Sequence, residues 1–198
     1  MNINFISVNH NVPNPDEQID SVPPKAGIYG WYYNFNRLQD FTNNPTRIKK
    51  ELLSISIKLK SPEFKTFLSA KFGNSFKGEV EHNSKFKEKD INERVDALSE
   101  KEIQSMLSIL ENFTQPLYIG IADNLRKRYN THYKSISENI CDTDRAKGKC
   151  FGHRVQQQEI KLEELVYKYQ VLDDMDRSNI EKIEYIANRF FKPIFGRR

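Results

Sequence analysis

Three short segments of the chain carry the residue pattern of β-strands. They are GIYGWYY at residues 27–33, PLYIGI at 116–121 and LVYKYQVL at 165–172. Aromatic and branched residues favour strands, and the third segment alternates apolar and polar residues, as a half-buried strand does. Pro116 suits the start of a strand, and the first strand is expected to lead into a turn near Asn34.

Apolar residues at spacings of three and four predict the helices. Ser99 with Glu102, and Ser178 with Glu181, have the spacing of a capping box, which closes the first turn of a helix. The last helix would bury one apolar stripe and stop at Pro193. The predicted helices are at residues 46–60, after Ser99, from 123 to about 138, around 154–160 and from 178 to 193. Asp123 would be the N-cap of the third of these. The apolar stripe of the last helix comprises Ile180, Ile183, Ala187 and Phe190.

The stretches outside these elements are mostly polar. The N-terminal arm, residues 1–25, contains four prolines and is expected to be extended or a loop. Residues 34–115 separate the first two strands, are lysine-rich and are expected to form a mainly helical insertion. Within them, residues 73–90 have little apolar content, which predicts a loop or a mobile flap.

The composition is that of an ordinary globular protein slightly rich in charge, with 37% hydrophobic and 29% charged residues. A chain of 198 residues can bury a core and suits a single domain. No apolar run approaches the roughly 18 residues that span a bilayer, and the N-terminal MNINFISVNHN lacks the layout of a signal peptide. We therefore expect a cytoplasmic protein with no membrane association. Its two cysteines are too few for a disulfide framework.

The formal net charge is +4, and it is unevenly distributed. Residues 121–154 carry eight Lys and Arg against four Asp and Glu, which supplies the whole net charge. A basic stretch of this kind suits a polyanionic partner such as nucleic acid, and it also occurs as an ordinary solvated surface.

Side chains with possible catalytic or binding roles lie on the helices that follow the second and third strands. Arg128 and His132 are four residues apart, so both project from one side of their helix, and either His132 or Tyr133 completes its apolar face. Glu184 is four residues after Ile180, which places its carboxylate against the buried stripe of the last helix. A carboxylate there needs a partner such as a cation or a metal.

Tyrosines on two strands, a guanidinium, an imidazole and a carboxylate together suit phosphodiester cleavage. A phenol with a pKa lowered by positive charge could take a proton from water, the guanidinium could bind the scissile phosphate, and the carboxylate could hold Mg²⁺. Taken singly, each residue has an ordinary explanation: a core tyrosine, a surface arginine, or a glutamate in a structural ion pair. Spacing alone leaves both interpretations open.

The two strand motifs, GIY at residues 27–29 and YIG at 118–120, resemble the pair that names the GIY-YIG nuclease family. In that family an essential arginine lies on the helix after the second motif, and Arg128 stands eight residues past Gly120. A histidine one turn later, as at His132, resembles the restriction endonuclease branch. The family's metal-binding glutamate lies nine residues before a proline, as Glu184 does before Pro193. The resemblance covers residues 26–33 and about 117–198.

The resemblance implies a role for each of these residues. Tyr29 would be the general base or a phenol that positions water, and Tyr118 would contact phosphate or metal-bound water beside it. Arg128 would bind the scissile phosphate, and His132 would assist near the nucleophile or the phosphate. Glu184 would be the sole protein ligand to Mg²⁺ or Mn²⁺.

Two positions depart from the family pattern, and the motifs are unusually far apart. Ile121 stands where a lysine often follows the YIG glycine, and Gly196 stands where an asparagine usually follows the proline by three residues.

The family usually joins its two motifs by about ten residues, whereas here residues 34–115 intervene. Loop closure cost rises only logarithmically with length, so the two strands can still pair. The insertion would grip DNA, form a dimer contact or stabilise the fold.

The combined expectation is a single α+β domain over residues 1–198, with a small three-stranded antiparallel sheet flanked by helices, as in the GIY-YIG fold. We predict a divalent-metal-dependent DNA endonuclease, restriction-like, that works as a homodimer or by sequential nicking. One alternative is a non-catalytic nucleic-acid-binding module, suggested by Gly196, and another is a repair or mobile-element nicking enzyme. A zinc site at Cys141, Cys150 and His153 is a weaker hypothesis, because the spacing matches no standard zinc finger.

Overall fold

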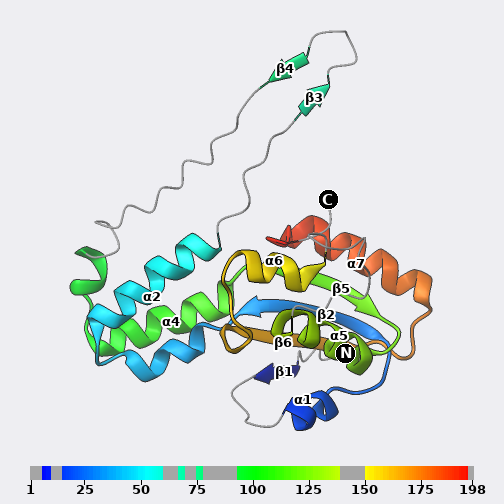
Figure 1. Cartoon of the computed structure of the whole chain (residues 1–198), viewed down its shortest axis with the longest axis horizontal. Coiled ribbons are helices and arrows are strands. Elements are labelled where there is room, and N and C mark those ends of the chain that lie inside the picture. Colours follow the sequence, from blue (N-terminus) through cyan, green and yellow to red (C-terminus); the bar gives the residue numbers. More distant parts are fainter. Residues whose placement is uncertain are drawn as a thin grey trace.

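The computed structural model describes residues 6–9, 15–59, 67–69, 75–77, 93–138 and 150–195. Within them the chain has an α+β fold, built on an antiparallel sheet with the strand order β1-β6-β2-β5 (Figure 1). The strands are β1 (Ile6–Asn9), β2 (Gly27–Tyr33), β5 (Tyr118–Ala122) and β6 (Leu165–Val171). The three strands predicted from the sequence are confirmed, as is the antiparallel sheet.

The N-terminal arm contains two regular elements. β1 adds a fourth strand by pairing antiparallel with β6, and α1 (Pro15–Ser21) is a short helix. The prediction that residues 1–25 are extended or a loop is therefore wrong for α1, whereas β1 is extended as predicted. Proline fixes a backbone angle that suits the first position of a helix as well as an extended chain, so prolines alone could not exclude α1.

β2 is the central strand of the sheet, and its register sets the candidate site. Tyr29 lies opposite Gly120 of β5 and Tyr169 of β6, and Trp31 lies opposite Tyr118 and Tyr167. Paired residues point to the same side of a sheet, and every second residue of a strand shares that side. One face of the sheet therefore carries a layer of aromatic side chains.

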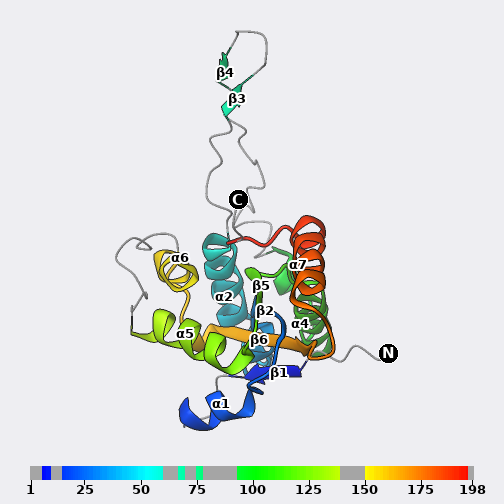
Figure 2. The ribbon, with the colours of Figure 1, turned by 90° about the vertical axis from the view of Figure 1, so that its right-hand side faces the viewer.

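Helices lie on both sides of this sheet and beyond one of its ends. α5 (Leu125–Ser137) and α6 (Phe151–Gln157) pack together on one side, and α7 (Arg177–Phe191) lies on the other side against β5 (Figure 2). α2 (Pro45–Lys58) and α4 (Glu100–Phe113) extend past the sheet, at the left of Figure 1. Two segments are 3₁₀ helices, η1 (Phe35–Phe41) and η3 (Leu162–Glu164), and residues 93–96 form a further short helical stretch.

The predicted helix starts are partly correct. The capping box of Ser99 and Glu102 is present at the start of α4. Asn124, rather than Asp123, caps α5, because its side chain accepts a hydrogen bond from the Lys127 N–H at 2.8 Å. The helix predicted around 154–160 begins three residues earlier, at Phe151.

The capping box predicted at Ser178 and Glu181 is wrong. α7 begins one residue earlier, with Asp176 as its N-cap, so Ser178 already lies inside the helix. Glu181 instead forms an ion pair with Arg177 across one helical turn, with Nε and Oε1 2.9 Å apart. Glu181 is therefore an exposed surface acid.

The predicted apolar stripe of α7 is correct only at its start. Ile180 is buried and Ile183 is half-buried, but Phe190 is 81% exposed. A helix turns by about 100° per residue, so ten residues leave Phe190 roughly 80° away from the direction of Ile180. Residues that continue this spacing along α7 therefore no longer lie on its buried face by Phe190.

The described part of residues 34–115 is mainly helical, as predicted. It contains η1, α2 and α4, together with two short paired strands, β3 (Phe67–Ser69) and β4 (Ser75–Lys77). β4 falls within residues 73–90, so the prediction of a loop is wrong at that strand. Three residues are too few to show an alternating pattern, and only the pairing with β3 reveals it.

A buried carboxylate ties this segment to the sheet. Glu164, 5% exposed just before β6, accepts hydrogen bonds from Lys58 Nζ at 2.9 and 3.0 Å. It also accepts from Arg37 at 3.0 Å and from the Tyr33 hydroxyl at 2.8 Å. Because Arg37 and Lys58 belong to the segment, these bonds hold η1 and α2 against the sheet.

A second carboxylate makes a similar connection through α4. Glu111 accepts a hydrogen bond from the Phe35 N–H at 2.9 Å, and its other oxygen lies 3.4 Å from Lys168 Nζ of β6. Lys168 Nζ also lies 4.9 Å from the centre of the Tyr32 ring. Three roles were considered for residues 34–115: gripping DNA, forming a dimer contact and stabilising the fold. The contacts described here suit the last of them.

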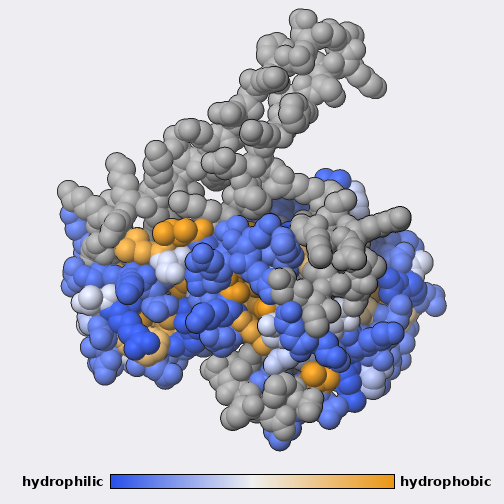
Figure 3. All heavy atoms as spheres, viewed as in Figure 1, coloured by the Kyte–Doolittle hydropathy of each residue, from blue (hydrophilic) through white to orange (hydrophobic). Residues whose placement is uncertain are grey.

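The surface has the character of a charged globular protein. The face seen in Figure 3 is mostly hydrophilic, and its hydrophobic areas are small and separate. Among the described residues, no helix combines the length and the apolar character needed to cross a membrane.

Candidate active site

The Tyr29 side chain of β2 meets His132 of α5. The Tyr29 hydroxyl oxygen and His132 Nε2 are 2.9 Å apart and form a buried hydrogen bond. Either group can donate, depending on which His132 nitrogen carries the proton. The helix spacing left His132 and Tyr133 as alternatives, and the structure places His132 on the buried face, with Tyr133 only half-buried.

Tyr118 completes a triangle of rings with this pair. The ring centres of Tyr29 and Tyr118 are 6.0 Å apart, and His132 lies 5.6 Å from each. Gly120 makes this possible, because an added Cβ would lie 2.7 Å from the Tyr29 hydroxyl oxygen and 2.8 Å from a Tyr118 ring carbon. The glycine of YIG is therefore required here by the closeness of two tyrosine rings.

Arg128 stands one turn before His132 on α5 and is half-buried. Its guanidinium forms no hydrogen bond or ion pair with any residue in the described ranges. Its charge acts on Tyr29 and Tyr167, because it lowers the pKa of both phenols against larger opposing effects. An arginine without a counter-ion beside two phenols suits an anionic ligand such as a phosphate.

The protonation of Tyr29 differs from the sequence-based expectation. Burial raises the pKa of Tyr29 well above its usual 10.0, the Tyr118 hydroxyl raises it further, and the positive charge of Arg128 only partly offsets them. The expectation of a phenol with a lowered pKa is therefore wrong for the protein alone, because desolvation outweighs the nearby charge. Tyr29 is a neutral hydrogen-bonding phenol.

These three rings are shielded from solvent. Tyr29 is 1%, Tyr118 6% and His132 7% exposed. Phe151, at the start of α6, covers them, with its ring centre 5.2 Å from Tyr118 and 5.4 Å from His132. A substrate can reach Tyr29 only if side chains around Phe151 move.

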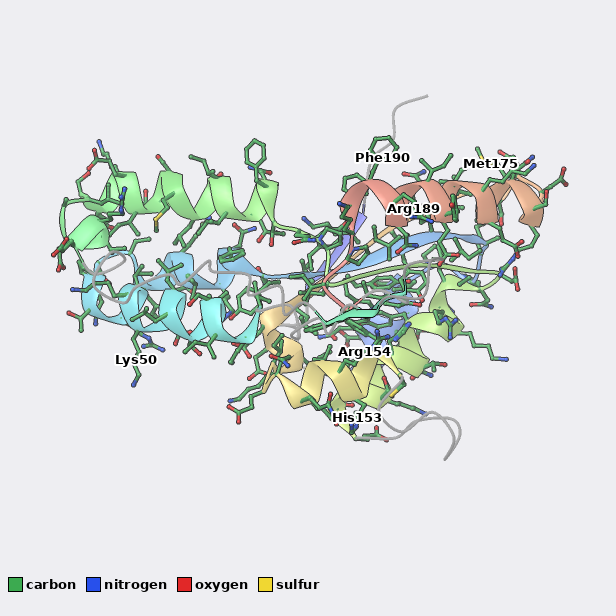
Figure 4. The ribbon with its side chains drawn as sticks, turned by 90° about the horizontal axis from the view of Figure 1, so that it is seen from above. Lys50, His153, Arg154, Met175, Arg189 and Phe190 are labelled. Atoms are coloured by element: carbon green, nitrogen blue, oxygen red, sulfur yellow. The ribbon has the colours of Figure 1, made fainter. Side chains whose placement is uncertain are left out.

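Glu184 approaches from a different part of the fold. It lies on the half-buried face of α7, as expected from its spacing to Ile180, whereas Glu181 is exposed. The hydrogen bond and ring contacts that join Tyr29, Tyr118 and His132 do not include it. α7 lies across the sheet from α5 and α6 (Figure 4). The hydrogen bond and the ring contacts therefore bring Tyr29, Tyr118 and His132 together, with Arg128 one turn before His132 on α5, whereas Glu184 belongs to a helix on the other side of the sheet.

Tyr167 of β6 lines the same site, and no pattern in the sequence indicated it. Its ring stacks on Tyr29 with centres 5.4 Å apart and packs on Trp31 at 5.1 Å. Tyr167 is fully buried, and its hydroxyl has no hydrogen-bond partner among the described residues. Its position opposite Trp31 in the register could have suggested it, but only once the strand pairing was known.

The described residues offer few metal ligands. Within them, no group of three or more His, Cys, Asp and Glu side chains is close enough to hold a metal ion. A single carboxylate such as Glu184 can still hold Mg²⁺ or Mn²⁺ when phosphate oxygens and water complete the coordination. The donor type of Glu184 therefore suits these ions.

Cys150, one of the three residues of the zinc hypothesis, cannot serve as a zinc ligand. Cys150 is disulfide-bonded, so it has no thiolate to offer, and its Sγ instead lies 3.4 Å from the His153 N–H at the start of α6. Cys141 lies outside the described residues, as does Gly196, the residue in place of the family asparagine.

No family model, no curated protein and no solved structure matches the chain. The GIY-YIG resemblance therefore rests on the sequence motifs and stays a prediction.

Proposed function

We propose that the protein is a divalent-metal-dependent DNA endonuclease of the GIY-YIG type, restriction-like, with its site formed by Tyr29, Tyr118, Arg128, His132 and Glu184. The observation that carries the proposal is the Arg128 guanidinium, which has no counter-ion among the described residues and lies one turn before His132, the hydrogen-bond partner of Tyr29. A half-buried cation without an acid is costly unless a ligand compensates it. A phosphodiester is such a ligand.

In this site the neutral Tyr29 hydroxyl would orient the attacking water rather than remove its proton as a phenolate. His132 Nε2 would receive a proton through Tyr29, and Tyr118 would donate a hydrogen bond to the phosphate. Arg128 would bind the scissile phosphate and stabilise the charge that develops on its oxygens. Mg²⁺ or Mn²⁺ held by Glu184 would supply charge neutralisation at the leaving oxygen.

The test is cleavage of supercoiled plasmid in Mg²⁺ or Mn²⁺. We expect nicking or linearisation by the unaltered protein, and loss of it in EDTA and in Tyr29→Phe, Arg128→Ala and Glu184→Ala. Glu181→Ala is the matched control, because Glu181 is an exposed acid on the same helix and should leave cleavage unchanged. Discrete products would indicate sequence specificity. No cleavage of varied DNA by the unaltered protein would refute the proposal.

The burial of the site favours a second candidate, a non-catalytic module that binds nucleic acid. Tyr29 and His132 are packed as core residues, beneath Phe151. DNA binding that persists in the absence of any cleavage would support this candidate. Under the endonuclease proposal, double-strand cleavage needs two sites, which a homodimer or two successive nicks would provide.

A further inference from the structure

Tyr167 of β6 carries a buried polar group that no described contact uses. Its side chain is fully buried, and its hydroxyl has no hydrogen-bond partner among the described residues. Buried polar groups are almost always hydrogen-bonded, because a group that loses water without gaining a partner costs free energy. A buried hydroxyl of this kind indicates that the group serves a ligand rather than the fold.

The next tyrosine on the same face of β6 shows the usual arrangement. Tyr169 is two residues further along the strand, so it points to the same side of the sheet as Tyr167. Its hydroxyl donates a hydrogen bond to the carbonyl oxygen of Ser21 at 3.5 Å. Burial on this face therefore does not by itself leave a tyrosine hydroxyl without a partner.

The Tyr167 ring joins the candidate active site to α5. It stacks on Tyr29 with ring centres 5.4 Å apart, and its centre lies 5.0 Å from that of Tyr129 on α5. Arg128 directly precedes Tyr129 on this helix. The side chain of Tyr167 therefore extends from the sheet toward the part of α5 that carries Arg128.

The charge of Arg128 acts on the Tyr167 hydroxyl. Burial raises the pKa of both Tyr29 and Tyr167, and the positive charge of Arg128 lowers both in part. A neutral phenol can donate one hydrogen bond, and a guanidinium can only donate. Neither Tyr167 nor Arg128 has a hydrogen-bond acceptor among the described residues. Two donors of this kind suit an anion that accepts from both.

We infer that the Tyr167 hydroxyl and the Arg128 guanidinium bind one anion together, a phosphate of the nucleic acid backbone. The identity of this anion as a phosphodiester rests on the proposed function, to which Tyr167 adds a substrate contact. Water suits the pair less well than an anion does, because water brings no charge to compensate Arg128. Since Tyr167 is fully buried, side chains over the site must move to admit the phosphate.

The test measures phosphate binding through its effect on stability. Denaturant unfolding is followed in EDTA with rising sodium phosphate, and with sodium chloride at equal ionic strength, because a ligand that binds the folded state raises the midpoint. Tyr167→Phe should weaken the apparent affinity for phosphate about tenfold, the usual worth of a hydrogen bond to a charged group, and Arg128→Ala should abolish binding.

Tyr169→Phe is the matched control. It removes a buried hydroxyl from the same face of the same strand, and that hydroxyl already has a protein partner, so phosphate affinity should stay unchanged. Phosphate also stabilises proteins in general because it is excluded from their surfaces. The comparison between the two variants removes this general effect.

Three results would overturn the inference. Equal phosphate affinity of Tyr167→Phe and the unaltered protein would mean that the hydroxyl meets water only. A lack of phosphate-specific stabilisation in the unaltered protein would mean that the pair binds no phosphate. A large loss of stability in Tyr167→Phe without phosphate would mean that the hydroxyl has a partner in the protein.

Plasmid cleavage is scored separately, so the two proposals can fail independently. Cleavage by the unaltered protein, with unchanged phosphate affinity in Tyr167→Phe, would refute the role of Tyr167 alone. Phosphate binding that is weakened in Tyr167→Phe, with no cleavage by the unaltered protein, would refute the nuclease alone.

Discussion

The Tyr29 hydroxyl and His132 Nε2 lie 2.9 Å apart, although 103 residues separate them in the chain. The contact exists because β2 and β5 pair in one register and because α5 starts directly after β5. It joins a strand phenol and a helix imidazole in a space from which water is excluded. Three predictions about the reaction follow from this pair and from Arg128.

Tyr29→Phe should abolish most cleavage while preserving the fold. The substitution keeps the ring and its packing on Tyr167 and removes only the hydroxyl that bonds to His132. General acid–base contributions of this kind are worth about 10²–10⁴ in rate. Single-turnover cleavage of a labelled duplex measures the loss.

The pH dependence of the same assay tests the protonation of Tyr29. Because burial raises the pKa of Tyr29 well above 10.0, its hydroxyl stays neutral through the usual assay range. If the Tyr29 phenolate were the base, the cleavage rate would rise about tenfold per pH unit between about pH 7 and about pH 9, and Tyr29→Phe would remove that rise. We expect no such rise. A rise of that size, lost in the variant, would show that the phenolate is the base and that the bound substrate lowers its pKa.

Arg128→Ala should lower cleavage about 10²–10³-fold, the usual effect of removing a charged group that stabilises the transition state. The same change should leave the free energy of unfolding nearly unaltered, since Arg128 has no ion pair with a described residue to lose. Lys127→Ala is the control, as an exposed cation on the same helix. Equal effects of the two substitutions on cleavage would mean that Arg128 contributes only general surface charge.

The sequence predicted the β-strands of the candidate site well because their signals are local. GIYGWYY, PLYIGI and LVYKYQVL each contain enough aromatic and branched residues to mark a strand, and all three are confirmed. The position of His132 followed from helical spacing as one of two alternatives. Burial of Glu184 on α7 likewise followed from its distance to Ile180.

Other features depend on contacts between distant residues, which no local pattern reveals. Tyr167 enters the site through its pairing with Trp31, and Phe151 covers it because α6 packs on α5. The raised pKa of Tyr29 reflects how deeply its ring is buried, whereas the sequence showed only the nearby positive charge. Glu184 lies on the half-buried face of α7 as expected, but no local pattern predicted that α7 lies across the sheet from α5.

The two buried tyrosines Tyr33 and Tyr167 should respond differently to loss of their hydroxyls. The Tyr33 hydroxyl donates to Glu164 at 2.8 Å and accepts from Arg37 at 2.6 Å, whereas that of Tyr167 has no described partner. Tyr33→Phe should lower the free energy of unfolding by about 1–3 kcal/mol, and Tyr167→Phe should leave it equal or higher. Denaturant unfolding measures both. A large loss in Tyr167→Phe would reveal a partner outside the described residues.

The ion pairs of Glu164 predict how stability depends on pH. Burial raises the pKa of this carboxyl, but hydrogen bonds from the Lys161 N–H, Lys58 and Tyr33 more than offset burial and hold the pKa below its usual 4.5. A group whose pKa is lower in the folded state stabilises the fold at pH values above its unfolded pKa. Its contribution is therefore complete at neutral pH and is lost as the pH falls below about 4.5 through the folded value.

Glu164→Gln should remove this contribution. The amide keeps the size of the side chain but leaves Lys58 and Arg37 without the charge they pair with, so we expect a loss of about 3 kcal/mol at neutral pH. The variant should also show a shallower fall in stability below about pH 4.5 than the unaltered protein. Glu163→Gln is the matched control, because its carboxylate is exposed and lies 3.8 Å from its only described partner, Lys161. If both variants unfold alike at every pH, the contacts of Glu164 do not hold α2 and η1 against the sheet, and residues 34–115 are anchored by apolar packing instead.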